Sequence, residues 1–485
     1  MSHTPVLLSD GNLKQPVSLW SLALIYAIFM AIFGDLIASI TLYLMQDLHL
    51  SQTQSYEMFG AYASMLWTLP LLGGYLCGRY GYRGATLIGL AFCVIGTACL
   101  IGQTPFLTYF GLSAFLAGNA FFTPGCWCLV DHIYGKDDRR REVGFTLFYL
   151  MFNIGAVVGI LAGGYVSETF GPVSTFIGCT VLLVLDLMFL GMVIPSLKFD
   201  EGRFLKAKVE QPHLWLTLKL LGFGIVMIIA AVLLFRYAAV NNVLTLIVAG
   251  LAILSLLWIA KRQTDTHSRK RVIAFVVLTI FAAIFWTMYN LEPSLISVFI
   301  STNVDTSLFG WHIPAESFFA FEGLFIVVNG LILSRYWTYL SKQGKSLPLP
   351  AKFGLALVLI GVGYLFLKFL LWVTGGSHLI ATIAVIWAYC FFAAGELFIG
   401  PLGISMVGKL CPAGQEGYFM GVWQLFMGLG GVLGGWVAIL VVIPDNIPLI
   451  QSNQIYGHWF VIVGIVGIVL GLIMMSFSPW LKKLI

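Results

Sequence analysis

Four acidic side chains inside otherwise apolar stretches are the residues best placed to do chemistry in this sequence. Glu396 lies midway along one apolar stretch, and Glu292 stands directly before Pro293 in another. Asp35 and Glu322 lie in two further stretches. A carboxyl group in such surroundings can take up a proton on one side of a barrier and release it on the other. We predict this role for Glu396, Glu292 and Asp35. The alternative is a protonated carboxyl that only hydrogen-bonds a neighbouring helix or, for Glu292, a solvated acid at a loop edge.

Residue patterns typical of enzymes and metal sites are missing from the sequence. No paired catalytic carboxylates, Ser–His arrangement or metal-ligand spacing accompanies these acids. The eight cysteines form no Cys-x-x-Cys pair, and Cys126-x-Cys128 alone is a poor ligand set. We therefore expect no enzyme, no metal and no cofactor, and we interpret the cysteines as small apolar side chains.

The composition places these acids in a membrane. Of 485 residues, 59% are hydrophobic and only 10% are charged, whereas soluble globular proteins carry about 25% charged residues. So few charges cannot cover a soluble particle of this size, and most of the surface must face lipid. This excludes a soluble enzyme, a nucleic-acid-binding protein and a disordered chain. The net charge of +5 then reflects Lys and Arg in membrane loops.

Long apolar runs indicate membrane-spanning helices rather than a barrel, because a helix needs about 20 apolar residues to cross the hydrocarbon core. The first run is longer than the core of a signal peptide, and no cleavage site of small residues follows it. We predict an all-α integral membrane protein with fourteen spans: 20–44, 56–78, 84–102, 107–130, 143–166, 172–194, 214–235, 243–260, 272–299, 317–340, 351–372, 379–406, 417–443 and 457–481.

Basic residues determine the expected orientation. With the N-terminus in the cytoplasm, all 26 Lys and Arg residues except Arg236 and Lys368 fall on cytoplasmic segments or helix ends. Cytoplasmic loops of membrane proteins carry an excess of Lys and Arg. We therefore expect both termini in the cytoplasm, which requires an even number of spans.

The spans are arranged as six, a pair and six. The pair, 214–235 and 243–260, stands between two basic linkers. We expect an N-terminal six-helix bundle over 1–194, a linker with the extra pair over 195–271, and a C-terminal six-helix bundle over 272–485. Two six-helix bundles around a central cavity are the architecture of the major facilitator superfamily, whose halves rock about a site at the midplane.

Motifs along nearly the whole chain resemble those of one transporter family. Residues 145–155 contain the pattern F-Y-x-x-x-N-x-G, and residues 134–140 are similar to Y-x-K-D-D-x-R. Residues 395–403 are similar to G-E-L-F-x-x-P-x-G. In this order the motifs resemble the proton-dependent oligopeptide transporter family, and an extra helix pair between the halves is typical of its bacterial members. The resemblance implies a secondary transporter that moves peptides together with protons.

Several positions that are charged in that family are neutral in this sequence. They are Tyr26, Phe29 and Met30 in place of E-x-x-E-R on the first span, Thr123 in place of a Lys on the fourth, and Asn290 in place of an acid on the seventh. Glu396, which matches an acid of the tenth helix, is kept. Opposed charges recognise the two ends of a peptide in the family. The loss of the cations therefore implies a peptide-like or modified amino-acid solute rather than an ordinary dipeptide.

The positions that match the cavity of the family form the predicted substrate site. They are Tyr26, Phe29, Trp67, Thr123, Tyr149, Asn153, Trp286, Asn290, Glu292, Glu322, Glu396 and Trp423. The aromatic members can form a cage that favours an apolar or cationic solute, although each of them can equally serve for packing alone.

We expect a proton-coupled secondary transporter that works by alternating access as a multi-pass protein of a bacterial inner membrane. Its expected partners are a small-molecule substrate, protons and lipid, without nucleic acid, and we expect a monomer. Two alternatives stay open. The chain can be an uncoupled facilitator or exporter of hydrophobic or cationic compounds, or a transport-inactive sensor.

Overall fold

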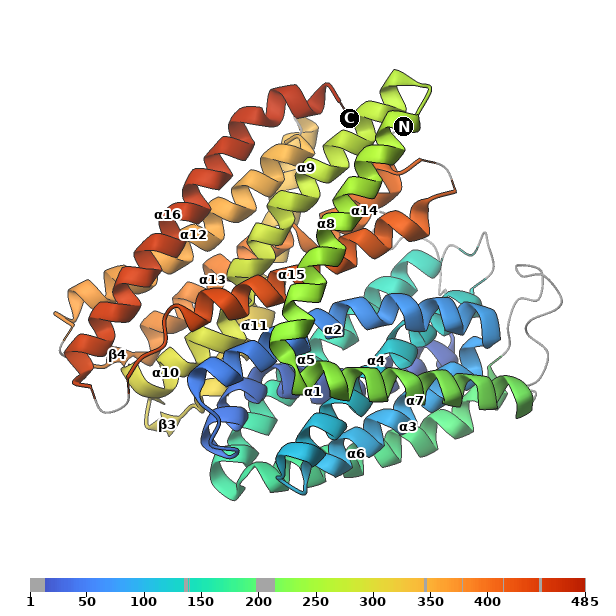
Figure 1. Ribbon diagram of the computed structural model, residues 1–485, viewed down its shortest axis with the longest axis horizontal. Coiled ribbons are helices and arrows are strands. Elements are labelled where there is room, and N and C mark those ends of the chain that lie inside the picture. The colour runs from blue at the N-terminus through green and yellow to red at the C-terminus, as the bar shows by residue number, and fades with distance from the viewer. Residues whose placement is uncertain are drawn as a thin grey trace.

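The computed structural model is almost entirely helical (Figure 1). It describes residues 14–134, 138, 140–197, 214–343, 347–376, 378–412, 414–444 and 447–484. Two bundles of long helices lie next to each other, with the first third of the chain in one bundle and the last half in the other (Figure 1).

Helices α1 to α6 form the N-terminal bundle. Their bounds are Val17–Gln46, Gln52–Tyr80, Tyr82–Leu100, Pro105–Ile133, Arg141–Phe170 and Pro172–Val193, and the short helix η1 follows at Ile194–Ser196. Ser51 begins α2 through a capping box with Gln54. Gly81 and Gly171 follow α2 and α5 with φ angles of 111° and 83°. Side chains with a Cβ rarely adopt such angles, so glycine permits the sharp turns into α3 and α6.

An extra pair of helices follows, α7 at Leu214–Arg236 and α8 at Ala238–Arg262. Helix α7 packs against α2, α3 and α4 of the N-terminal bundle, whereas α8 contacts α2 on one side and α9 and α15 on the other. Helix α7 therefore lies on the N-terminal bundle, and α8 lies at the junction of the two bundles (Figure 1).

The C-terminal bundle contains two interrupted spans and four continuous ones. The first interrupted span consists of α9 at Thr266–Tyr289, η3 at Glu292–Ile296 and α10 at Ser297–Asn303, and the second consists of α13 at Thr382–Leu397 and α14 at Gly400–Leu410. The continuous spans are α11 at Phe319–Lys342, α12 at Leu349–Val373, α15 at Glu416–Ile439 and α16 at Leu449–Lys482.

Short strands lie between the helices of this bundle. They are β1 at Val304–Asp305, β2 at Ser307–Leu308, β3 at Trp311–His312 and β4 at Ile380–Ala381, with the short helix η4 at Ala315–Phe318. Strands β2 and β3 form an antiparallel hairpin, and β1 pairs with β4 in parallel.

Thirteen helical segments of the described chain are long and apolar enough to cross a membrane. The remaining long helix, α2, has 29 residues and is less apolar, and it packs against α4, α8 and α15. The predicted all-α membrane fold is therefore confirmed. The predicted boundaries at 194/195 and 271/272 stay predictions, since α9 already begins at Thr266 and the linker over 198–213 lies outside the described residues.

Glycines let the helices approach closely both within and between the bundles. A Cβ on Gly159 of α5 would overlap the backbone of Ala31 on α1. A Cβ on Gly435 of α15 would crowd the carbonyl of Tyr56 on α2. Small residues at such contacts are typical of membrane helix packing. The α2–α15 contact joins the two bundles along much of their length.

The two ends of the molecule differ in how the bundles meet. We call the end with the α1–α2 turn and the β2–β3 hairpin the hairpin face, and the end with the start of α1 and the α8–α9 turn the linker face. At the hairpin face, α1 contacts η3, η4 and α10, and His312 Nε2 lies 2.6 Å from Glu168 Oε1 on α5. At the linker face, no comparably extensive contact joins α4 or α5 to α13 or α14 in the described ranges. The bundles are therefore closed together at the hairpin face.

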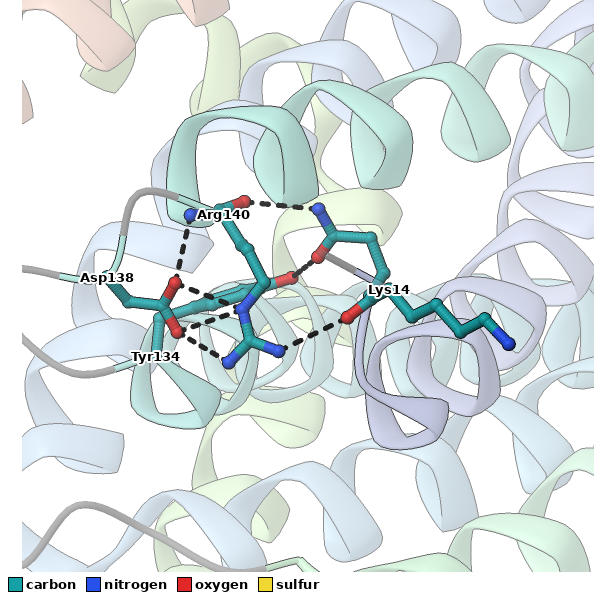
Figure 2. A network of polar contacts seen from close by, with 5 residues as sticks. Lys14, Tyr134, Asp138 and Arg140 are labelled. Carbon is teal, nitrogen blue, oxygen red and sulfur yellow. Dashed lines mark hydrogen bonds and ion pairs between the residues drawn. The ribbon is translucent and has the colours of Figure 1, made fainter. Parts of the chain in front are cut away.

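A polar network at the linker face ties the segment before α1 to the α4–α5 connection (Figure 2). Arg140 Nη2 donates to Asp138 Oδ2 at 2.8 Å, and Arg140 Nη1 donates to the carbonyl of Lys14 at 3.2 Å. Tyr134 Oη donates to Gln15 Oε1 at 2.8 Å. These contacts hold the beginning of α1 against the N-terminal bundle.

Candidate functional site

A cavity of about 160 Å³ lies between the two bundles. Helices α1, α2 and α5 form its wall on the N-terminal side, and α9, η3, α11 and α13 form its wall on the C-terminal side. A site between two halves that move against each other is where a carrier binds its substrate.

Three glutamates from three elements gather at the C-terminal wall. Glu322 and Glu396 line the cavity, and they interact with each other. Glu292 is fully buried next to them. The hydroxyl of Tyr289 donates a hydrogen bond to Glu322 Oε2 at 3.1 Å. Both carboxyl oxygens of Glu292, Oε1 of Glu322 and Oε2 of Glu396 have no hydrogen-bond partner within the described part of the chain.

Interruptions in two helices position these carboxyl groups. Helix α9 stops at Tyr289 and α10 begins at Ser297, with Pro293 in the wide turn between them. Proline has no N–H group to donate within a helix, which accounts for the interruption at Pro293. Helix α13 ends directly after Glu396, and α14 begins at Gly400. Interrupted helices near the middle of the membrane are typical of transporter binding sites.

The N-terminal wall has no charged side chain among the described residues. Phe33, Phe59, Leu66 and Phe152 are among the residues that form it. Its polar groups are the indole N–H of Trp67 and the amide of Asn153, whose Nδ2 donates to the carbonyl of Tyr149 at 2.9 Å.

Half of the predicted substrate-site residues lie in the cavity wall. These are Trp67, Asn153, Trp286, Asn290, Glu322 and Glu396. Two of them approach each other across the bundles, with the ring centroids of Trp67 and Trp286 6.4 Å apart. The structure does not bring the other predicted residues into the wall, namely Tyr26, Phe29, Thr123, Tyr149, Glu292 and Trp423.

Tyr26 and Phe29 instead belong to the core of the N-terminal bundle. The ring of Tyr26 stacks on Phe148 with centroids 4.8 Å apart, and its hydroxyl accepts a hydrogen bond from Trp127 Nε1 at 3.0 Å. Phe29 packs 4.5 Å from Phe122. Aromatic packing thus fills the space on α1 where the family motif has charges.

The remaining predicted residues have other surroundings. Thr123 donates a hydrogen bond to Asn119 Oδ1 at 2.6 Å along α4. Trp423 packs against Gly403 inside the C-terminal bundle. Tyr149 is about half exposed, and its ring stacks on Phe152 of the cavity wall with centroids 5.5 Å apart.

Asp35 lies in a different cavity, at the hairpin face. This cavity of about 400 Å³ is also lined by Glu168, His312 and Glu316. Asp35 is 3% exposed, and Cys179 Sγ donates to its Oδ2 at 3.8 Å. Asp35 is thus separate from the three glutamates of the central cavity, and its predicted part in proton transfer stays a prediction.

Sequence reasoning missed Tyr289 and Glu316. Tyr289 is three residues after Trp286, and residues three apart share a helix face, so this spacing was a usable indication. Glu316 stands one residue before the predicted span 317–340. Its contact with the Asp35 cavity depends on how η4 packs against α5, which is not visible in the sequence.

Comparisons with known proteins agree with this architecture. The model of the POT family matches residues 84–456. Dipeptide and tripeptide permease B of Salmonella typhimurium is 28% identical over 458 residues, covering 92% of this chain and 91% of the permease. Dipeptide and tripeptide permease A of the same organism is 27% identical over 457 residues, covering 91% and 88%. These relatives are permeases and not enzymes.

Solved structures share the fold. One is a bacterial homologue of the human drug peptide transporters, with a TM-score of 0.83, 21% identity and coverage of 96% of this chain and 99% of that one. Another is a POT family transporter in complex with 5-aminolevulinic acid, with a TM-score of 0.81, 21% identity and coverage of 97% and 98%. The predicted major facilitator fold is thereby confirmed. Since the family model covers most of the chain, this protein belongs to the POT family of proton-dependent oligopeptide transporters.

Proposed function

We propose that this protein moves a small peptide-like or modified amino-acid solute across the membrane by alternating access, with the transport coupled to protons. The observation that carries the proposal is the cavity between the bundles with Glu322, Glu396 and Glu292 at its C-terminal wall. The relatives named as dipeptide and tripeptide permeases support the peptide-like class. The related structure that holds 5-aminolevulinic acid supports a solute as small as a modified amino acid.

The carboxyl cluster supplies the coupling in this proposal. Two ionised carboxylates about 4 Å apart repel by about 4 kcal/mol at an effective dielectric constant of 20. A cluster of three buried carboxyl groups therefore holds protons or a cationic group whenever the cavity is closed to water. Proton release when the cavity opens to one side, and uptake when it opens to the other, ties the conformational cycle to the proton gradient.

Among the three glutamates, we assign the main proton site to Glu396. It lies at the end of α13, directly before the interruption that leads to α14. A change of angle between α13 and α14 would alter the access of water to this carboxyl group. Glu292 is farther from the cavity wall and serves as a second proton site.

We further propose that the linker face is cytoplasmic in a bacterial inner membrane, since nearly all basic residues fall on that side. The described conformation, closed at the hairpin face, is then the one open toward the cytoplasm. We propose that the chain works as a monomer, because each bundle pair forms its own cavity. We also keep the bundle boundaries at 1–194, 195–271 and 272–485 as proposals.

Uptake into proteoliposomes under an imposed inward proton gradient tests the proposal. Labelled dipeptides, tripeptides, amino acids and their amides are offered to the wild type, to Glu396→Gln and to Glu416→Gln, which changes an acid at the linker face outside the cavity. We expect the wild type and Glu416→Gln to accumulate a solute. At a solute concentration that saturates each variant, gradient-driven uptake by Glu396→Gln should fall at least tenfold, whereas exchange of solute without a gradient should be kept.

Two results would contradict the proposal. Accumulation by Glu396→Gln equal to that of the wild type would remove Glu396 from the coupling. Uptake by the wild type that is the same with and without the gradient would favour an uncoupled facilitator instead.

A further inference from the structure

Charged side chains occupy only one wall of the central cavity. Glu322 and Glu396 lie on the C-terminal wall, and no Lys, Arg or His of the described chain lines the cavity on either side. Glu322 is 3% exposed, and its Oε1 and Oε2 of Glu396 are buried without a hydrogen-bond donor among the described residues. Two adjacent carboxyl groups therefore lie at the wall of a site to which no described residue contributes a cation. An ammonium group, with three N–H donors and a positive charge, satisfies both.

A third unpaired polar atom belongs to Trp286 of the same wall, and this atom is a donor. The indole N–H of Trp286 is buried, and its Nε1 has no acceptor among the described residues. The indole group can only donate, so an acceptor atom on the substrate would complete its hydrogen bonding. A neutral carbonyl oxygen fits this need at the same time as the ammonium group pairs with the carboxyls.

A free carboxylate has no comparable partner in this cavity. The N-terminal wall is formed by apolar side chains and by two neutral donors, the indole N–H of Trp67 and the amide of Asn153, one N–H of which is engaged with the Tyr149 carbonyl. A buried carboxylate without a cation is strongly disfavoured. It would also repel Glu322 and Glu396. The site thus discriminates against amino acids and peptides that carry a free C-terminus.

The apolar wall and the volume limit the body of the substrate. Phe33, Phe59 and Phe152 offer contacts to an apolar side chain. The volume of about 160 Å³ is close to the roughly 150 Å³ of an apolar cavity that holds benzene. A leucine-sized or phenyl-sized side chain therefore fits in the described conformation.

We propose that the substrate is a small monocationic amine without a free carboxylate, which carries a neutral carbonyl next to an apolar body. Amides and esters of amino acids or dipeptides belong to this class. The ammonium group binds between Glu322 and Glu396, and the carbonyl oxygen accepts from Trp286 Nε1. The inference rests on the proposed transport through this cavity and specifies its substrate.

Binding to the purified protein at a fixed pH, without any gradient, tests the inference. The probes are two matched pairs, leucinamide with leucine and alanyl-leucinamide with alanyl-leucine, together with N-acetyl-leucinamide, which lacks the charge, and 3-methylbutylamine, which lacks the carbonyl. Isothermal titration gives the affinities. We call the amide with the higher affinity, leucinamide or alanyl-leucinamide, the better amide, and we expect it to bind at least tenfold more tightly than its free acid. N-acetyl-leucinamide should bind at least tenfold more weakly than leucinamide.

Variants assign the contacts within the site. Glu322→Gln and Glu396→Gln should each weaken binding of the better amide at least tenfold, whereas Glu416→Gln should leave it unchanged. Trp286→Phe should weaken binding of leucinamide severalfold and leave that of 3-methylbutylamine unchanged. Thermal unfolding of each variant confirms that it is folded.

Equal affinity for amides and free acids, or the absence of saturable binding for all of these probes, would overturn the inference. The failure of this inference and of the proposed transport are distinguishable. Tight binding of the amide without gradient-driven uptake would refute only the coupling. Gradient-driven uptake of ordinary dipeptides with a free carboxylate would refute only the substrate class.

Discussion

Tyr289 connects the interrupted span α9–α10 to the carboxyl cluster. It is the last residue of α9, and its hydroxyl donates to Glu322 Oε2 at 3.1 Å. A buried acceptor that loses its donor destabilises the folded protein, because no hydrogen bond compensates for its removal from water. Tyr289 therefore has a double role, because it satisfies one oxygen of Glu322 and leaves the other oxygen free for a ligand.

Tyr289→Phe should lower the stability of the folded protein by about 1 kcal/mol, as the loss of one buried hydrogen bond does. It should also weaken binding of the better amide, because the Glu322 carboxyl is then free to turn away from the cavity. Thermal unfolding and titration calorimetry measure both effects. The control is Tyr165→Phe, since Tyr165 is exposed on α5. An unchanged affinity in Tyr289→Phe would show that Tyr289 has no part in positioning Glu322.

At the scale of elements, the α4–α5 connection anchors the start of α1. Arg140 binds both Asp138 and the carbonyl of Lys14 (Figure 2). The Arg140 guanidinium holds the pKa of the Asp138 carboxyl below its usual range. A carboxyl group whose pKa is lowered in the folded state stabilises that state at a pH above its usual pKa of about 3.9. The stabilisation is lost as the pH falls through the lower pKa of the folded state.

Asp138→Asn should therefore lower the stability at pH 6 by at most about 1 kcal/mol, as expected for a pair near the surface. The difference from the wild type should shrink at pH 3. Thermal unfolding at both pH values gives the result, with Glu57→Gln at the hairpin face as the control. A difference that is equal at pH 6 and pH 3 would mean that the Asp138 charge does not stabilise the connection.

At the scale of the whole molecule, the two bundles meet through contacts of different kinds. Close packing of α2 on α15, assisted by Gly435, joins them along the membrane. At the hairpin face the contact is more polar and includes the contact of His312 Nε2 with Glu168 Oε1. Packed helices can rock about a tight apolar contact, whereas polar contacts at one end can separate and reform in water. The hairpin face is accordingly the end expected to open in the next step of transport.

Glu168→Gln should shift the population toward the conformation open at the hairpin face. Both side chains of the pair are about half exposed, so the pair contributes at most about 1 kcal/mol, and the population should change by less than tenfold. Hydrogen exchange of the segment 304–318 measures the opening and should become faster. Glu416→Gln at the linker face should leave this exchange unchanged. Unchanged or slower exchange in Glu168→Gln would argue against a closing role of the contact between Glu168 and His312.

Much of this fold follows from the sequence because lipid imposes strong local rules. A span needs a long apolar run, so most of the spans can be found from hydropathy. Pro293 marks an interruption because proline lacks an N–H group. Family motifs are also local, so Glu322, Glu396 and Trp286 could be selected before their surroundings were known. All three residues lie in the wall of the central cavity, as the motifs led us to expect. Their functions stay predictions.

Only the tertiary structure decided which faces of the helices meet. Tyr26 and Phe29 match cavity positions of the family, yet their rings pack with Phe148 and Phe122 in the N-terminal bundle. The rotation of α1 about its axis depends on its contacts with α4 and α5, and hydropathy cannot fix it when nearly every face of a helix is apolar. For the same reason the sequence showed a set of isolated acids. The packing of α11 against α13 turned two of them, Glu322 and Glu396, into neighbours on one wall of a cavity without a cation.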